Sequence, residues 1–209
     1  MRLTTPDPRW LGRTVIVAAP GPSLTEDVAG RCEGLPAIVV NDAWRLLPWA
    51  DVLFATDAAW WHFHRGVPTF KGEKWSSHGT GNDKQDVASA YGIKCVAGKH
   101  GAEFLTEPGR ICYGSNSGFQ AINLAIQFGA SRIILVGFNM QRVGGAMHFF
   151  GDHPRGLRNA DPIRFRTYFH QAARKMPAGV TIINATPDTA LDCFPKMSLA
   201  DALNEKVAA

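Results

Sequence analysis

Short apolar runs rich in β-branched residues alternate with helix-like segments along most of this chain. Six runs stand out, and the first, 14–19, is continuously apolar, as expected of a strand covered on both faces. The runs are 14–19, 37–41, 51–56, 93–96, 132–137 and 180–184. The clearest helical pattern, over 117–128, has one broad apolar face. We therefore predict a single Rossmann-like α/β domain over 1–209, with a doubly wound, mainly parallel sheet and helices on both faces.

Two stretches interrupt this rhythm. Residues 70–81 are rich in Gly, Ser and Lys, which favours an exposed loop or a short hairpin. Residues 141–162 contain Gly, Pro, Arg, His and Asp almost without periodicity, and a long irregular segment inside a compact domain is often functional. Because few buried contacts are expected to hold it, we predict that 141–159 borders a ligand crevice and is mobile without ligand.

The balance of charge and hydropathy argues against several classes of protein. Lys and Arg number 22 against 18 Asp and Glu, a net charge of +4 that is too small to indicate nucleic-acid binding but suits a phosphate-bearing ligand. No apolar run approaches the ~20 residues of a membrane span, and residues 1–10 lack the apolar core of a signal peptide, so we expect a cytoplasmic protein. Widely spaced cysteines without a CxxC pair favour reduced, mostly buried thiols: Cys32, Cys95, Cys112 and Cys193.

A glycine turn, Gly21-Pro22-Ser23, follows the first predicted strand. Ser23 and Glu26 have the spacing of a capping box, which predicts that a helix begins there. The glycine allows a ligand to approach the backbone closely, and the free N–H groups of a helix start favour phosphate. A plain strand-to-helix turn explains the motif equally well, since it is neither a GxGxxG fingerprint nor a P-loop.

Polar residues also follow the second and third predicted strands, at the edge where open α/β sheets bind ligands. Asn41 could read a base or a ribose, or form an Asx-turn that caps the next helix. Asp57 could hold Mg²⁺ or a sugar hydroxyl, or cap the helix that follows it. His62 and His64 come next, but their i, i+2 spacing separates them on a helix, which argues against a metal pair.

Two later motifs occupy comparable positions. Ser117-Gly118 opens the best predicted helix, where small hydroxyl residues either cap the helix or bind an anion. Gly137 and Asn139 end a buried strand, where they either contact a ligand or form a tight turn.

The irregular segment carries the candidates for acid–base chemistry. His148 and His153 titrate near neutral pH, and Arg155 and Arg158 can pair with phosphate. The two histidines with Asp152 match no strong metal-ligand spacing, so we predict no metal site there. The apolar neighbours of His148 favour a structural ring, whereas the polar neighbours of His153 favour one that faces a ligand.

In this order the motifs resemble those of bacterial sialyltransferases of glycosyltransferase family 42 and of the related 6-hydroxymethylpterin diphosphokinase-like proteins. The likeness runs from about residue 13 to 203 and includes Ile-Asn-Ala-Thr-Pro-Asp at 183–188. The resemblance to sialyltransferases implies that His153 is a general base. It also implies a set of residues around the cytidine nucleotide of a sugar donor: Gly21, Pro22, Ser23, Asn41, Ser117, Gly118 and Gly137. The resemblance to the diphosphokinase-like group implies roles for Asp57 and His148 instead.

The chain departs from both groups at Asn139, where aspartate is common, and at Pro20, where a small or polar residue is common. Our first hypothesis is a glycosyltransferase with a CMP- or UDP-linked sugar donor, in which Arg155 or Arg158 neutralises the leaving phosphate. The acceptor would be a glycan, a small molecule or a modified nucleic-acid base. The alternatives are an ATP- and Mg²⁺-dependent diphosphokinase of the 6-hydroxymethylpterin type, and a non-catalytic nucleotide-binding module in which Asn139 marks lost chemistry. A homo-oligomer is compatible with each, and the compact length suits a phage or prophage gene.

Overall fold

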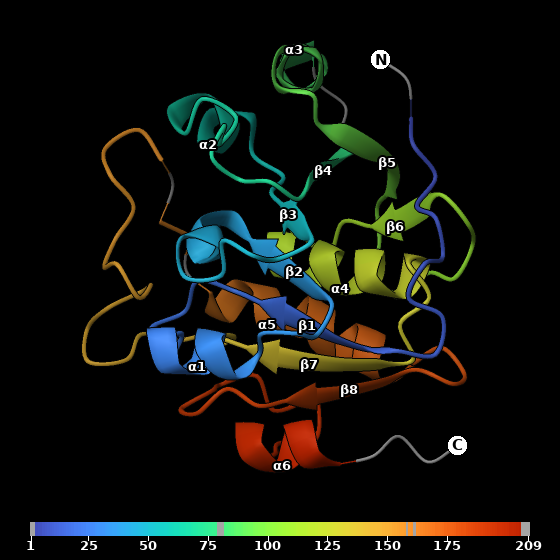
Figure 1. Ribbon diagram of the computed structural model, residues 1–209, viewed down its shortest axis with the longest axis vertical. Helices are drawn as coiled ribbons and strands as arrows, with labels where there is room; N and C mark the ends of the chain where they lie inside the picture. Colours follow the sequence, from blue (N-terminus) through green and yellow to red (C-terminus); the bar gives the residue numbers. More distant parts are fainter. Residues whose placement is uncertain (1–2, 79–81, 158, 161, 206–209) are drawn as a thin grey trace.

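The computed structural model describes residues 3–78, 82–157, 159–160 and 162–205, without the side chains of 78 and 82–86. Its centre is one eight-stranded sheet with the order β6-β5-β4-β3-β2-β1-β7-β8 (Figure 1). Every neighbouring pair is parallel. The doubly wound α/β class predicted from the sequence is confirmed, and all six apolar runs contain strands. The strands are β1 (Thr14–Ala18), β2 (Ala37–Val40), β3 (Val52–Phe54), β4 (Glu73–His78), β5 (Lys94–Lys99), β6 (Arg110–Cys112), β7 (Arg132–Val136) and β8 (Thr181–Asn184).

Helices cover both faces of the sheet, because successive residues of a strand point to opposite sides. Val15 and Val17 belong to the core that includes α4 (Ser117–Gln127) and α5 (Ile163–Ala173). Ile16 and Ala18, from the same strand, belong to the opposite core. That core includes α1 (Glu26–Arg31), the 3₁₀ helix η1 (Asn41–Arg45), α2 (Ala58–Phe63), α3 (Asn82–Tyr91) and α6 (Leu199–Asn204).

The direction of winding reverses beside β1. From β1 the chain adds β2 to β6 on one side, and then returns to place β7 and β8 on the other. In open α/β sheets the carboxyl ends of strands at such a reversal form the ligand crevice. The described part of the connection between β7 and α5 lies on the side toward which β1 and β7 point (Figure 1).

The prediction of a loop or hairpin over 70–81 is wrong for 73–78, which form β4 inside the sheet. This strand pairs with β3 and β5, and its Trp75, Ser76 and Ser77 are buried. A strand with only one large apolar residue carries a weak local signal, because its stability comes from neighbouring strands and packing. The three-residue β6 was also missed, since it is too short to show a pattern.

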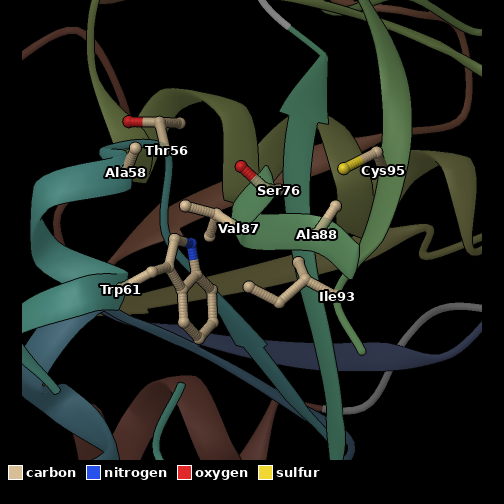
Figure 2. A pocket seen from close by; sticks show the side chains of 8 residues that line it. All are labelled: Thr56, Ala58, Trp61, Ser76, Val87, Ala88, Ile93 and Cys95. Atoms are coloured by element: carbon tan, nitrogen blue, oxygen red, sulfur yellow. The ribbon is translucent and has the colours of Figure 1, made fainter. Parts of the chain in front are cut away.

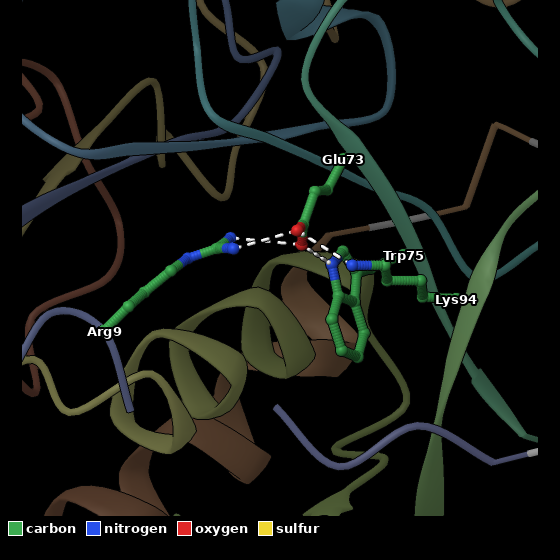
Figure 3. Close-up of polar contacts among 4 residues, drawn as sticks. All are labelled: Arg9, Glu73, Trp75 and Lys94. Atoms are coloured by element: carbon green, nitrogen blue, oxygen red, sulfur yellow. Dashed lines mark hydrogen bonds and ion pairs between the residues drawn. The ribbon is translucent and has the colours of Figure 1, made fainter. Parts of the chain in front are cut away.

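A network of charged groups ties the start of β4 to the N-terminal segment (Figure 3). Arg9 donates hydrogen bonds of 2.9 and 3.1 Å to the two carboxylate oxygens of Glu73. Lys94 Nζ and Trp75 Nε1 donate to the same carboxylate at 2.8 and 2.7 Å. Burial acts to raise the pKa of Glu73, but these donors together outweigh it and hold the pKa at about 2.

The cysteines behave as packing residues. All four lie among the described residues and form no disulfide; three are buried and Cys193 is half-buried. Burial raises the pKa of Cys32 to about 11 and that of Cys193 to about 12, so both thiols stay protonated at neutral pH. In the part of the chain that the structure describes, no helix is both long and apolar enough to cross a membrane.

Candidate functional site

The loops that leave β1 and β7 are joined directly to each other. Gly21 N–H donates to the carbonyl oxygen of Gly137 at 3.0 Å. The backbone N–H and the hydroxyl of Ser23 both donate to Asn139 Oδ1, at 3.1 and 2.8 Å. A Cβ atom at Gly21 would collide with Gly137 O and Asn139 Oδ1, and Gly137 itself has a φ of +72°. Close approach of the two loops therefore requires both glycines.

This joint uses the backbone donors that the glycine turn was predicted to offer to phosphate. Leu24 N–H is also occupied, by Gly21 O, and Pro20 and Pro22 have no N–H group. The predicted capping box is wrong: α1 begins at Glu26, and the cap is Thr25, whose hydroxyl accepts from Val28 N–H at 3.3 Å. Phosphate binding at this turn remains a prediction.

Asn139 explains one departure from the family pattern. Its Oδ1 accepts from Ser23, and its Nδ2 donates to Pro187 O at 3.0 Å, so both ends of the amide are used. The side chain is 1% exposed. An aspartate here would lack the donor that Pro187 O requires, so an asparagine suits this joint between loops.

Asn41 leaves β2 with a buried polar atom that has no partner. It lies in the left-handed region (φ +47°), and its Oδ1 makes no hydrogen bond within the described structure. The alternative role as a helix cap is not observed, because η1 has no side-chain cap. A buried acceptor without a donor costs about 1–3 kcal/mol, a cost that a ligand donor would remove.

The next residue, Asp42, is the buried carboxylate of the site. Its side chain is 4% exposed, and Oδ2 accepts from Trp60 Nε1 at 2.7 Å. His64 Nε2 lies 3.4 Å and Arg45 Nη1 3.9 Å from Oδ1. Sequence analysis did not identify Asp42, Arg45 or His64 as site residues. The available signal was the i, i+4 spacing of Trp60 and His64 on α2, which brings both rings to one carboxylate.

The two histidines of α2 diverge, as predicted. His62 Nδ1 lies 3.2 Å from Tyr91 Oη on the exposed side, whereas the His64 ring packs 4.4 Å from that of Trp60. Burial lowers the pKa of His64, Asp42 opposes that shift, and Arg45 and His153 add to it.

The irregular segment packs against this cluster. Phe149 N–H donates to Pro20 O at 3.0 Å, and the guanidinium of Arg45 lies 6.0 and 5.6 Å from the rings of Phe149 and Phe150. His148 stacks on Phe150 at 5.0 Å between ring centroids. The segment thus makes more contacts than its sequence indicates, because aromatic rings replace periodic apolar residues. Its mobility remains a prediction.

His148 and His153 lie together within this segment, with ring centroids 4.4 Å apart. Burial, with the neighbouring His153, lowers the pKa of His148 to about 4, against the opposing effects of the Gly151 hydrogen bond, Asp42 and Asp152. Burial also lowers the pKa of His153. Both imidazoles are therefore neutral at pH 7, and His153 Nδ1 is buried without a hydrogen-bond partner in the described part of the chain. A neutral ring with an unused nitrogen is suited to accept a proton.

Ser117, Gly118 and Asp57, which were also predicted for the site, each make different local contacts. Ser117 Oγ lies 2.8 Å from Thr56 Oγ1 after β3, while Asn116 caps α4, and Gly118 packs against Phe138. Asp57 precedes α2 with an exposed side chain that does not cap it. Its charge acts on His153.

The two predicted loop arginines add little to the described geometry. Arg155 is exposed, and Arg158 lies outside the described residues. Arg45 is instead the cation whose contacts place it at the cluster.

The described part of the cluster borders one small cavity, and a larger hollow lies elsewhere on the molecule. Among the described residues, no group of three or more His, Cys, Asp or Glu side chains is arranged to hold a metal ion. A cavity of about 10 Å³ between α2, α3 and the sheet borders the site at Thr56 (Figure 2). It holds at most one water molecule. An open hollow of about 550 Å³ is lined by other residues, between the β5–β6 loop and the end of α5.

Comparison with known proteins gives a fold but no family. No family and no curated protein matches the chain. Among solved structures, the chain is similar to a MAf glycosyltransferase from Magnetospirillum magneticum AMB-1, with a TM-score of 0.65 and 14% identity. The match covers 99% of this chain and 37% of that one, so this chain spans little more than a third of that protein. The chain therefore has a glycosyltransferase-like fold.

Proposed function

We propose that the protein is a nucleotide-sugar-dependent glycosyltransferase that transfers a sugar to a hydroxyl acceptor. The observation that carries this proposal is that two of the six buried polar atoms without a partner among the described residues, Asn41 Oδ1 and His153 Nδ1, belong to the cluster beyond the carboxyl ends of the strands. Buried polar groups normally have partners. With Trp44 Nε1, whose ring lies against that of His64, the cluster has three such exceptions beside neutral histidines, which favours a ligand site.

The donor nucleotide would lie over the carboxyl ends of β1 and β2. Asn41 Oδ1 would accept a hydrogen bond from the base or the ribose, which suits a CMP- or UDP-linked sugar. Arg45, with Arg155 and Arg158 from the loop, would neutralise the phosphate that leaves. A CMP-linked sialic acid is the donor that the sequence resemblance favours.

His153 would act as the base. One ring nitrogen takes the proton of the acceptor hydroxyl while the acceptor oxygen forms a bond to the anomeric carbon. The bond between that carbon and the phosphate oxygen breaks, and the electron pair leaves with the nucleotide. General-base assistance of this kind contributes roughly 10²–10⁴-fold to a rate.

A thermal-shift screen with CMP, UDP, GDP and ATP, each with and without Mg²⁺, tests the donor. A ligand at ~100 Kd adds about 2.7 kcal/mol, which for a chain of this size raises Tm by roughly 5–10 °C. Stabilisation by CMP or UDP, followed by turnover of the matching nucleotide sugar, supports the proposal. Stabilisation by ATP only with Mg²⁺ would favour the diphosphokinase, and binding without turnover across a broad acceptor screen would favour the module.

The variant Asn41→Gly makes the screen specific to the site. Glycine keeps the left-handed backbone and removes only the side-chain amide. We expect at least a tenfold loss of affinity for the stabilising nucleotide. His170→Ala serves as the control and should bind normally, because His170 forms an exposed pair with Asp192 and belongs to α5, which packs on the opposite face of the sheet from η1 and α2.

A further inference from the structure

Asp42 has no role in the step just described, yet it is the most enclosed charge of the cluster. Its carboxylate is 4% exposed and accepts a short hydrogen bond from the neutral indole of Trp60. Its two other partners stay farther away, at 3.4 Å for the His64 imidazole and 3.9 Å for the Arg45 guanidinium. A buried carboxylate held mainly by a neutral donor keeps most of its negative charge available to its surroundings.

The surroundings of Asp42 are mostly histidines. η1 contributes Arg45, and His64 directly follows α2. In the irregular segment, the Phe150 ring lies 5.6 Å from the Arg45 guanidinium and 5.3 Å from the His153 ring, so the segment brings three further titratable groups toward Asp42: His148, Asp152 and His153. The exposed Asp57 also acts on His153. Asp42 is therefore the one buried anion that the described residues place among three neutral imidazoles.

We propose that Asp42 is a positioning residue for the transfer reaction, which orients His64 and stabilises the positive charge that His153 gains with the acceptor proton. This inference rests on the proposed function. It assigns to a residue outside the loop the role of making His153 a stronger base. The proton moves from the acceptor oxygen to His153, and Asp42 takes no part in the transfer itself.

The substitution Asp42→Asn isolates the charge. Asparagine has the same shape, and its Oδ1 can still accept from Trp60 Nε1, so we expect the fold and the affinity for nucleotide to remain. Loss of the negative charge should lower the pKa of His153 and weaken it as a base, so kcat should fall by up to roughly tenfold. The acidic limb of the pH–rate profile should move to lower pH in this variant.

Histidine titration by NMR gives a result that does not depend on turnover. In Asp42→Asn the resonances of His64, His148 and His153 should all titrate at lower pH than in the wild-type protein. Asp192→Asn, which breaks the exposed His170–Asp192 pair of 3.0 Å, is the matched control and should change only His170. Unchanged pKa values at the three site histidines would overturn the role of Asp42, even if the protein is an active transferase.

A measurement on the wild-type protein covers the case in which Asp42→Asn fails to fold. The side-chain carboxyl ¹³C resonance of Asp42 should show an inflection at the pH where His153 titrates. Its absence would overturn the inference. If the shift is present but no nucleotide sugar is turned over, the proposed function fails and the electrostatic coupling stands.

Discussion

Two carboxylates, Glu73 and Asp42, each accept a hydrogen bond of 2.7 Å from a tryptophan indole, yet their surroundings differ. Glu73, at the amino end of β4, also binds Arg9 and Lys94 through three hydrogen bonds of 2.8–3.1 Å. Asp42, at the carboxyl end of β2, has an imidazole and a guanidinium at 3.4 and 3.9 Å, and it lies among histidines with an unsatisfied atom nearby. Glu73 has close hydrogen-bond donors on both carboxylate oxygens, so its role is in stability. Asp42 has only one close donor, as expected of a carboxylate at a site where a reaction takes place.

The largest expected effect is on catalysis, in the region around Asp42 and His153. His153→Ala should lower kcat by ~10²-fold or more, because it removes the proposed base. Nucleotide affinity should hardly change. Kinetics with the donor found in the thermal screen would measure both.

His148→Ala separates the base from its neighbour. His148 stacks on Phe150 and its Nδ1 lies 3.2 Å from Gly151 O, so its removal should cost roughly 1–3 kcal/mol of stability. If His148→Ala is stable but inactive while His153→Ala remains active, the base is His148 and the diphosphokinase-like comparison gains support.

The sequence predicted the frame of the site better than its chemistry. Continuous apolar strands fixed the sheet class, and strand-end residues such as Asn41 and Gly137 were placed at the correct edge. Asp42 and Arg45 could not be identified as site residues from the sequence, because their neighbours come from η1, α2 and the irregular segment, which meet only in the folded protein. Ser23 was interpreted as a helix cap, because a local pattern does not reveal that its hydroxyl donates to Asn139, 116 residues away in the sequence.

In the network around Glu73, the largest effect of a substitution should be on the free energy of unfolding. Glu73→Gln leaves Arg9 and Lys94 without their anion and should cost about 1–2 kcal/mol, a value reduced by partial exposure of the site. Denaturant unfolding would measure this loss. Nucleotide affinity should equal that of the wild-type protein. A clear loss of affinity would contradict the view that the Glu73 network acts on stability alone and the region of Asp42 on function.

Acid should separate the two regions by pH. The site histidines have pKa values below the 6.5 of the unfolded chain, to about 4 for His148, so the unfolded state binds protons first and stability falls as pH drops from 6.5 toward 4. Glu73, at about 2 in the folded state against 4.5 unfolded, contributes stability that is lost between pH 4.5 and 2. Each proton adds a slope of at most about 1.4 kcal/mol per pH unit.

Unfolding curves at several pH values, with His148→Asn and Glu73→Gln beside the wild-type protein, would test this separation. His148→Asn should flatten the upper range only, and Glu73→Gln the lower range only. A variant that flattens both ranges would show that the two regions titrate as one unit.

The smallest expected effect is a change in hydrogen exchange within the irregular segment. Its described part is fixed near the site by the Phe149 N–H bond to Pro20 O and by ring contacts with Arg45, whereas Gly144 and Gly145 are exposed. A nucleotide that satisfies Asn41 would stabilise η1 and the rings packed on it, so exchange over 142–153 should slow when the nucleotide binds. The backbone amides of β4, which lies inside the sheet, should exchange slowly in both states. Equal protection of the segment with and without nucleotide would contradict its role at the ligand crevice and leave the strand ends as the whole of the site.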